Sequence, residues 1–277
     1  MKILLTYEDR TRKDSTGFYF HQAFKRLADV IHVHNEELSY INPKSFDLFV
    51  KIDDGLTLQS FRAKDFHPSV FYAIDTHIEA VDRIKMSEES AFDHIFCAQK
   101  KGAEMKWHTD NVHFLPLACD PNFHKVVGKR DKRWDLCFIG NVQPSWQKRR
   151  VDRLDLMFRK FPNFYFGNKF FLEMAEKFAE SKLIFNSQYS DDINMRVFEA
   201  LCSGSALFTE KLDWQELFID DYHFISYASD EEMVSKAEYY LREDNLREDI
   251  AKRGQIEVLT KHTYLERARS ILEKCKI

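Results

Sequence analysis

The sequence contains little glycine. It has 8 glycines in 277 residues, against 25 phenylalanines, so few positions remain for glycine-rich phosphate loops. Neither GxGxxG nor GxxxxGK[ST] occurs, so the fingerprints of dinucleotide-binding and P-loop proteins are missing. GxSxG is also absent, since Ser203-Gly204-Ser205 is not a nucleophile elbow. The motifs therefore support none of these three enzyme classes.

Metal-binding motifs are equally scarce. No two aspartates are spaced i,i+2, and no HExxH occurs. His32 and His34 are spaced i,i+2, which places both on one face of a strand. A metal pair is conceivable there, but a polar strand face is the preferred interpretation. We therefore predict no metal site.

Other absences concern the cellular context. The five cysteines are scattered, odd in number and without CxxC spacing, which indicates reduced and mostly buried thiols. The N-terminal apolar run is too short for a signal peptide, and no stretch approaches the roughly 18 apolar residues of a membrane span. We expect a cytoplasmic protein, and leave peripheral membrane or partner-protein contact open. With a net charge of -4, no nucleic-acid partner is predicted.

Strand-like apolar runs alternate with helix-like segments along the chain. This alternation favours an α/β fold in which helices cover both faces of parallel sheets. The predicted strands are 1–6, 30–34, 46–50, 70–74, 94–97, 112–115, 134–140, 163–166, 183–186, 205–209 and 223–226. The predicted helices are 17–27, 78–86, 149–158, 192–202, 229–240, 245–258 and the segment from 263 onward.

Residues 116–133 interrupt the alternation with two prolines, a glycine and a run of charges, and are interpreted as a linker. We expect two Rossmann-like doubly wound domains, at 1–130 and 131–277, that face each other across a cleft. The last helix is a candidate to cross back to the first domain. Ligands of such sheets lie beyond the carboxyl ends of the strands, so the residues that follow each strand are the candidates for function.

The most informative segment is 186–204, which is predicted to form a strand end, a polar loop, a helix and a glycine stop. Ser190, Asp191 or Asp192 is expected to cap the helix, whose first free amides can hold a phosphate. Arg196 and Glu199 lie on one helix face, where the arginine suits a phosphate and the carboxylate suits ribose hydroxyls. On spacing alone, an ordinary surface ion pair is the favoured alternative.

The region from about 183 to 271 resembles the C-terminal domain of CgeB-like glycosyltransferases, the spore-maturation-protein type, which have the GT-B fold. The resemblance rests on the Asn186 strand end, Arg196-Val197-Phe198-Glu199-Ala200, Gly204, Phe208-Thr209-Glu210, His262-Thr263-Tyr264 and Arg267. Residues 115–121 resemble the family's interdomain linker, and 138–141 resemble the first strand and turn of its second domain.

The resemblance implies an acceptor-side domain at 1–130 and a nucleotide-sugar-binding domain at 131–277. The donor would be a nucleoside diphosphate sugar, with a UDP-sugar expected, and no other cofactor is implied. Asn141 and Asn186 would lie at the donor site. Lys148 or Arg149 would stabilise the departing diphosphate, although a solvated basic helix start remains an alternative for both.

The resemblance also assigns roles on the predicted helix. Glu199 matches the ribose-binding carboxylate, the second acid of the E-x7-E pattern of related retaining enzymes. Asp191 stands at the first acid position, which is a departure from that pattern. Asn194 stands where the pattern often has a glycine near the diphosphate. Arg196 would bind phosphate.

The acceptor side is less defined. Asp75, His77 and His21 are candidates for a general base or for orienting the acceptor, while a cap or core-edge role is the alternative for each. The predicted function is metal-independent transfer of a sugar, of the hexosyl type, to an unidentified glycan, protein or small molecule. A non-catalytic nucleotide-sugar-binding subunit and a GT-B-fold sugar-nucleotide epimerase remain alternatives.

Overall fold

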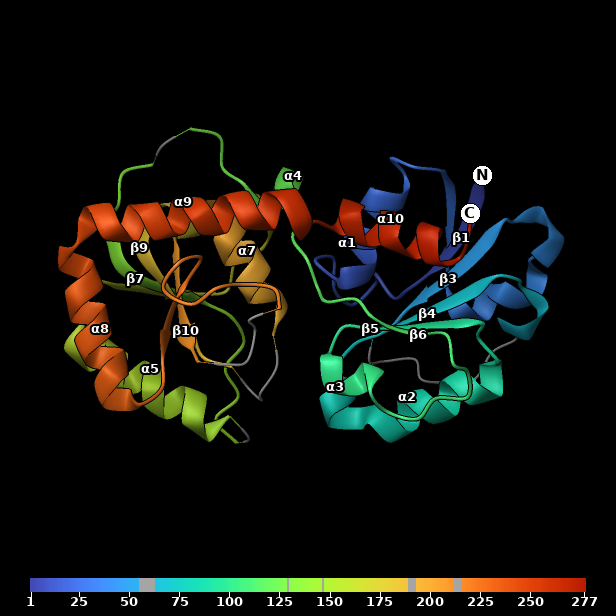
Figure 1. Ribbon diagram of the computed structural model, residues 1–277, viewed down its shortest axis with the longest axis horizontal. Helices are drawn as coiled ribbons and strands as arrows, with labels where there is room; N and C mark the ends of the chain where they lie inside the picture. Colours follow the sequence, from blue (N-terminus) through green and yellow to red (C-terminus); the bar gives the residue numbers. More distant parts are fainter. Residues whose placement is uncertain (55–62, 129, 146, 189–192, 212–215) are drawn as a thin grey trace. The chain divides into compact units, whose positions relative to one another are not determined.

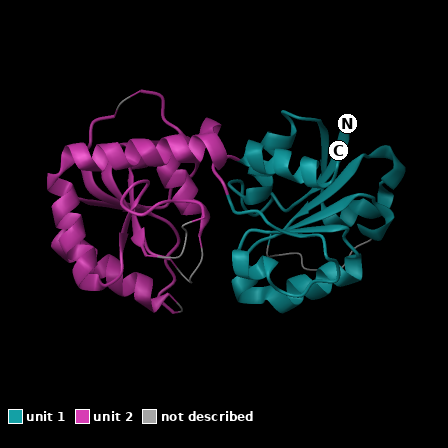
Figure 2. Ribbon diagram, in the orientation of Figure 1, with its two compact units in different colours: residues 1–117, 264–277 teal, residues 118–263 magenta. Residues whose placement is uncertain are grey.

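The computed structural model describes residues 1–54, 63–128, 130–145, 147–188, 193–211 and 216–277. The chain divides into two compact units (Figure 2). Unit 1 comprises Met1–Leu117 and Tyr264–Ile277, and unit 2 comprises Ala118–Thr263. Residues 118–130 thus belong to the second unit and the last helix to the first. Asp191, one of the predicted site residues, lies outside the described residues.

Unit 1 is built on a parallel sheet. Its strands in the described residues lie in the order β2-β1-β3-β4-β5-β6. They are β1 Lys2–Thr6, β2 Asp29–Val33, β3 Leu48–Ile52, β4 Ser69–Ala73, β5 His94–Cys97 and β6 Val112–Phe114. β3 and β4 are buried along their whole length, because helices cover both faces of the sheet.

The helices of unit 1 form two layers (Figure 1). α1 and α10 pack together on one face, where Tyr19 stacks on Tyr264 with ring centroids 5.3 Å apart. α2 and α3 lie on the other face. The α-helices are α1 Thr16–Phe24, α2 Thr76–Ser90, α3 Lys100–Ala103 and α10 Tyr264–Lys274, and the 3-10 helices are η1 Asn35–Tyr40, η2 Pro43–Ser45 and η3 Ala63–Asp65.

Unit 2 has a second parallel sheet. Its strands in the described residues lie in the order β11-β10-β9-β7-β8. They are β7 Trp134–Ile139, β8 Phe164–Gly167, β9 Ser181–Asn186, β10 Ala206–Glu210 and β11 Ile225–Tyr227. Aromatic and aliphatic side chains of β7, β9 and β10 form the centre of its core.

The helices of unit 2 also form two layers. α6, α7 and α9 pack on one side, and α5 and α8 pack on the other (Figure 1). Gly204 ends α7 with a φ of +80°, a backbone conformation that favours glycine. The helices are α4 Pro121–His124, α5 Lys148–Lys160, α6 Phe171–Ala179, α7 Met195–Ser203, α8 Asp230–Arg242 and α9 Asp244–Lys261.

Each sheet reverses its strand order at one point. In unit 1 the chain runs from β1 to β2 on one side and then to β3 on the other. In unit 2 it runs from β7 to β8 and then crosses to β9. The carboxyl ends of β1/β3 and of β7/β9 are therefore the topological switch points, where doubly wound sheets bind ligands.

Two of the segments that carried the family resemblance have structural roles. Arg267 of α10 is buried, and its Nε donates to the carbonyl oxygen of Pro116 at 2.7 Å. The amide of Cys119 donates to the carbonyl of His262 at 3.0 Å, so the segments at 118–119 and 262–263 pair within unit 2. These residues stabilise the places where the chain leaves and re-enters unit 1.

The structure differs from the sequence prediction in two places that affect the site. A helix at Phe171–Ala179 was not predicted. The predicted helix at 192–202 begins only at Met195, after Asn194 as its N-cap, so the expected caps at Ser190, Asp191 or Asp192 are wrong. In the described residues, no helix is both long and apolar enough to cross a membrane.

Candidate functional site

The switch point of unit 2 is bridged by an arginine. Arg150, in the first turn of α5, donates from Nε to the carbonyl oxygen of Ser187 at 2.8 Å and from Nη1 to that of Asn141 at 2.9 Å. Asn141 follows β7 and Ser187 follows β9, so this side chain joins the carboxyl ends of the two strands. Its Nη2 has no hydrogen-bond partner among the described residues. The guanidinium thus retains donors for a further group.

A second arginine faces the first. Burial, and then the positive charge of Arg196, lowers the pKa of Arg150. A guanidinium group that lies near a second cation is stabilised when an anion binds beside both. The amino terminus of α7, next to Arg196, carries the positive end of the helix dipole and adds free amides. The switch point thus combines two guanidinium groups with the amides that begin α7.

Arg196 is held in place by its own helix and by α6. Its Nη1 donates to Oε2 of Glu199 at 2.6 Å and contacts the sulfur of Met174. Its guanidinium lies over the ring of Phe178, 5.5 Å from the centroid. The ion pair that the i,i+3 spacing suggested is therefore present, and α6 packs against its cationic half.

Glu199 is buried, with only 3% of its surface exposed. Its Oε1 lies 3.5 Å from Nε2 of His124, which is itself completely buried. Because Nδ1 of His124 accepts the amide hydrogen of Asp120 at 3.0 Å, the proton of a neutral ring is on Nε2 and points to the carboxylate. Both oxygens of Glu199 thus have protein partners, and the expected ribose contact would have to replace one of them.

Several buried polar atoms beside the arginines lack partners. Among the described residues, Ser187 Oγ, both amide atoms of Gln188 and Asn194 Oδ1 make no hydrogen bond. Ser187 and Gln188 are almost fully buried. Each such atom costs roughly 1–3 kcal/mol when it stays unpaired, so native proteins keep few of them. Their concentration at one strand end is the pattern expected of a binding site for a polar ligand.

Two of the three asparagines predicted for the site, Asn186 and Asn194, are neighbours. Asn194 donates from Nδ2 to Oδ1 of Asn186 at 3.3 Å, and Asn186 donates to Thr209 Oγ1 at 3.1 Å. As the N-cap of α7, Asn194 makes no side-chain capping bond. Its side chain instead joins the start of α7 to the end of β9, within reach of the unpaired atoms.

The basic start of α5 has three members with different environments. Arg149 pairs with Glu210, a buried carboxylate at the end of β10 that also contacts Arg153 and accepts the amide hydrogen of Gln188 at 2.7 Å. Lys148 is exposed and lies 3.9 Å from Asp152. A cavity of about 450 Å³ lies against this helix start. Lys148 and Arg149 are thus placed at the carboxyl edge of the sheet, but Arg150 makes the contacts at the switch point.

The acceptor-side candidates come from separate strand ends of unit 1. Asp75 is exposed and occupies the N-cap position of α2 in a left-handed conformation, without a side-chain capping bond. Gln99 takes over that role, because its Oε1 accepts from the amide and the hydroxyl of Thr76 at 3.2 and 3.1 Å. His77 lies in the first turn of α2. In the sheet, β4, which these residues follow, is separated from β1 by β3.

His21 belongs to a different group. Its Nδ1 lies 3.0 Å from the hydroxyl of Tyr7, which follows β1, and its ring centroid lies 5.6 Å from that of His32. Burial, and then the charges of His32 and Lys25, lowers the pKa of His21 to about 4. The ring is neutral at physiological pH, and a base with such a low pKa is weak.

Comparison with known proteins gives a family and a fold. A family model described as "Glycosyl transferase-like" matches residues 121–273, more than half of the chain. No curated protein matches the sequence significantly.

Several similar solved structures cover the whole chain. Anabaena HepE in complex with UDP and glucose has a TM-score of 0.66 at 12% identity, over 100% of this chain and 99% of that chain. The β-glucosyltransferase of phage T4 has a TM-score of 0.64 at 12% identity, over 100% of both chains. An α-glucosyltransferase in complex with UDP and a 13-mer DNA containing a HMU base has a TM-score of 0.69 at 12% identity, again over 100% of both. These are GT-B structures, and they confirm the predicted fold class.

Proposed function

Because the chain belongs to the glycosyl transferase-like family, we propose that it transfers a hexose from a UDP-sugar to an acceptor hydroxyl, with the donor held at the β7–β9 switch point of unit 2. A place in the CgeB-like group, metal-independent transfer and the cytoplasmic location expected from the sequence are part of this proposal.

The observation that carries the proposal is the pairing of Arg150 with Arg196 beside unpaired buried polar atoms. A diphosphate has the charge and the several acceptor oxygens that two guanidinium groups require. The amides at the start of α7 add donors of the kind that hold phosphates at helix N-termini. Ser187, Gln188 and Asn194 supply donors and acceptors for the neutral polar parts of a nucleotide or sugar.

In the proposed reaction the bond between the anomeric carbon and the β-phosphate oxygen breaks, and a bond from the acceptor oxygen to that carbon forms. The acceptor proton passes to a base on the acceptor side, for which Asp75 and His77 remain candidates. UDP leaves with an additional negative charge. Arg150, Arg196 and the α7 amides stabilise this charge, and preorganised donors of this kind are worth about 10²–10³-fold in rate each.

We assign the other predicted residues to positioning the arginines or to outer contacts with the donor. Glu199, through its ion pair and His124, positions Arg196, and a ribose hydroxyl can exchange with one of these partners. Arg149 stays a candidate for the outer diphosphate oxygens, because half of its side chain is exposed beside the cavity at the start of α5. Asn141 contributes its backbone carbonyl to the positioning of Arg150.

The choice of UDP rests on the similar structures that hold UDP or UDP-glucose. Two other similar structures, both of α-glucosyltransferase, hold UDP together with a 13-mer DNA. We propose a glycan, protein or small molecule as the acceptor, in keeping with the acidic net charge of this chain.

Release of UDP from a panel of UDP-sugars tests the proposal. Acceptors should include glycans, a protein extract, small alcohols and duplex DNA. We expect release that depends on one acceptor class and an acceptor that gains the mass of a hexose. Conversion of the UDP-sugar to an isomer without an acceptor would identify an epimerase, and donor binding without any turnover would identify a binding subunit.

A matched pair of variants ties the activity to the switch point. Arg150→Gln should lower UDP release at least about 10²-fold. Arg159→Gln changes an exposed arginine on the same helix that pairs with Asp155, and should leave the rate within about twofold. Equal rates in the two variants would remove Arg150 from the donor site.

A further inference from the structure

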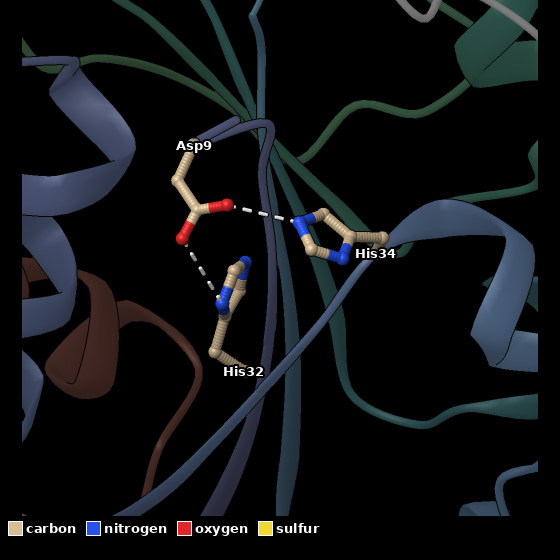
Figure 3. Close-up of side chains that lie close together, drawn as sticks. All are labelled: Asp9, His32 and His34. Atoms are coloured by element: carbon tan, nitrogen blue, oxygen red, sulfur yellow. Dashed lines mark hydrogen bonds and ion pairs between the residues drawn. The ribbon is translucent and has the colours of Figure 1, made fainter. Parts of the chain in front are cut away.

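Three potential metal ligands converge at the carboxyl edge of unit 1. Asp9 follows β1, His32 lies in β2 and His34 follows that strand. One ligand atom from each lies within 4.8 Å of the others, and the three side chains point toward one another (Figure 3). The i,i+2 spacing places both imidazoles on one face of β2, and the parallel pairing of β1 with β2 brings the aspartate to that face.

The ring of His32 is oriented by a hydrogen bond to the backbone. Its Nε2 lies 3.0 Å from the carbonyl oxygen of Tyr7, and a carbonyl only accepts, so Nε2 carries a proton. In the neutral ring, Nδ1 is then an unprotonated lone pair, and it lies 3.9 Å from Oδ2 of Asp9. That distance is too long for a hydrogen bond, and two electron-rich atoms face each other with space between them.

The ring of His34 is oriented by a carboxylate. Its Nδ1 lies 3.4 Å from Oε2 of Glu37, and that carboxylate is itself fixed because it accepts the backbone amide of His34 at 2.8 Å. The other nitrogen, Nε2, lies 2.9 Å from Oδ1 of Asp9. The contact of Nε2 with Asp9 needs a positive centre between the two atoms, which is either the proton on Nε2 or a metal ion that replaces it.

These are the two outer partners that metal-binding histidines commonly have, a backbone carbonyl for one ring and a carboxylate for the other. They fix which nitrogen of each ring faces inward. Ligand atoms that each lie about 2.1 Å from one ion are roughly 3–4 Å apart, which is the range of the distances from Asp9 to the two rings.

We propose that Asp9, His32 and His34 bind one divalent transition-metal ion of the zinc class. Two imidazoles with one carboxylate suit zinc and its neighbours in the first transition series, whereas magnesium and calcium prefer oxygen ligands throughout. Three protein ligands leave at least one coordination position for water or for an oxygen of another molecule. All three side chains are partly exposed, so the ion has access from solvent.

This site shares no residue with the proposed donor site. All of its residues, and the outer partners Tyr7 and Glu37, belong to unit 1, whereas the arginines that we assign to the diphosphate belong to unit 2. Removal of the metal should therefore leave the affinity for UDP unchanged. The prediction from the sequence was that His32 and His34 form only a polar strand face, and that interpretation is the alternative that the experiment must exclude.

Metal binding is best measured on the untagged full chain after treatment with EDTA and removal of the chelator. Titration with Zn²⁺ in a calorimeter should give one site per chain. Titration with Co²⁺ should give visible absorption bands that saturate at the same stoichiometry. His32→Ala and His34→Ala should each weaken Zn²⁺ binding at least about 100-fold, and Glu37→Gln, which alters an outer partner, about 10-fold or more.

A second histidine–carboxylate pair provides the control. His67 lies 2.9 Å from Asp93, and in the part of the chain that the structure describes no third ligand completes a site there, so His67→Ala should bind Zn²⁺ as the wild type does. Circular dichroism of each metal-free variant shows that it is folded. Saturable binding that persists in the His32→Ala,His34→Ala double variant, or the absence of one-to-one binding in the wild type, overturns the proposal.

Discussion

The two units have the same order of strands around their switch points but place side chains of opposite charge there. In unit 2 the cation Arg150 joins the carboxyl ends of β7 and β9 through two backbone carbonyls. In unit 1 the anion Asp54 joins the carboxyl ends of β1 and β3. Its Oδ2 accepts one hydrogen bond from the amide of Glu8 at 3.1 Å and another from Nζ of Lys51 at 2.7 Å. The same strand order around the switch point thus carries the proposed anion site in one unit and an ion pair of Asp54 with Lys51 in the other.

The groups that surround Arg150 and Asp54 differ as well. Beside Arg150 lie a second guanidinium and buried polar atoms without partners. Beside Asp54, the ammonium of Lys51 is buried against the carboxylate. The comparison indicates that the fold supplies the location, whereas the few side chains after each strand decide which ligand charge is accepted there.

The largest expected effect concerns Arg196. Arg196→Ala removes a phosphate ligand and leaves the buried Glu199 without its guanidinium, so turnover should fall about 10²–10³-fold. Initial rates at saturating UDP-sugar measure the loss. The exposed i,i+3 pair of Arg269 with Glu266 in α10 has the same spacing, and Arg269→Ala should leave the rate unchanged. A similar loss in both variants would show that the effect is not specific to the switch point.

An intermediate effect distinguishes ligand-binding from structural glutamines. Gln188→Leu replaces unpaired buried atoms, so the thermal midpoint should hold or rise while the affinity for UDP falls about 10-fold. Gln99 is equally buried but accepts two hydrogen bonds at the start of α2. Gln99→Leu should therefore lower the midpoint and leave the affinity for UDP intact. Differential scanning fluorimetry and calorimetry measure the two quantities, and destabilisation by Gln188→Leu would contradict the assignment.

The smallest expected effect concerns His21 in unit 1 and the dependence of stability on pH. The pKa of His21 is about 4 in the folded chain against 6.5 as its ordinary value, so the unfolded chain takes up this proton first as the pH falls. Its contribution to stability is complete above pH 6.5 and is lost as the pH falls toward 4. Because the ring is only partly buried, we expect about 1 kcal/mol.

His21→Gln removes this dependence. Urea denaturation of the metal-free chain at pH 7.5 and 4.5 should show a larger loss of stability in the wild type than in the variant. Parallel losses in both chains would mean that the histidine is not buried as the structure places it.

Much of the fold follows from the sequence because both sheets are nearly all buried and parallel. Their strands then read as short apolar runs, and the residues after those runs fall at the carboxyl edges. Asn186 was placed at the end of β9 in this way, whereas Arg196 and Glu199 were singled out by the family resemblance. The start of α7 was misplaced by three residues, because caps are local choices among several polar residues in succession.

Three features of the sites could not be predicted. Three consecutive cations begin α5, and the sequence does not fix how the helix is rotated about its axis. That rotation decides that Arg150 is the one whose side chain reaches the strand ends. α6, whose Met174 and Phe178 contact Arg196, was missed even though its buried residues recur at helical spacing. Asp9 meets His32 and His34 only through the parallel pairing of two strands, a contact between residues far apart in the sequence.

The most direct test compares the affinities of UDP and uridine in a calorimeter. If Arg150 and Arg196 hold the diphosphate, UDP should bind the wild type at least about 100-fold more tightly than uridine. The Arg150→Gln,Arg196→Gln double variant should bind the two within about threefold of each other, because two charge-assisted contacts of roughly 1.5–3 kcal/mol are lost. An unchanged preference for UDP in the double variant would contradict the central claim that these two arginines form the diphosphate site.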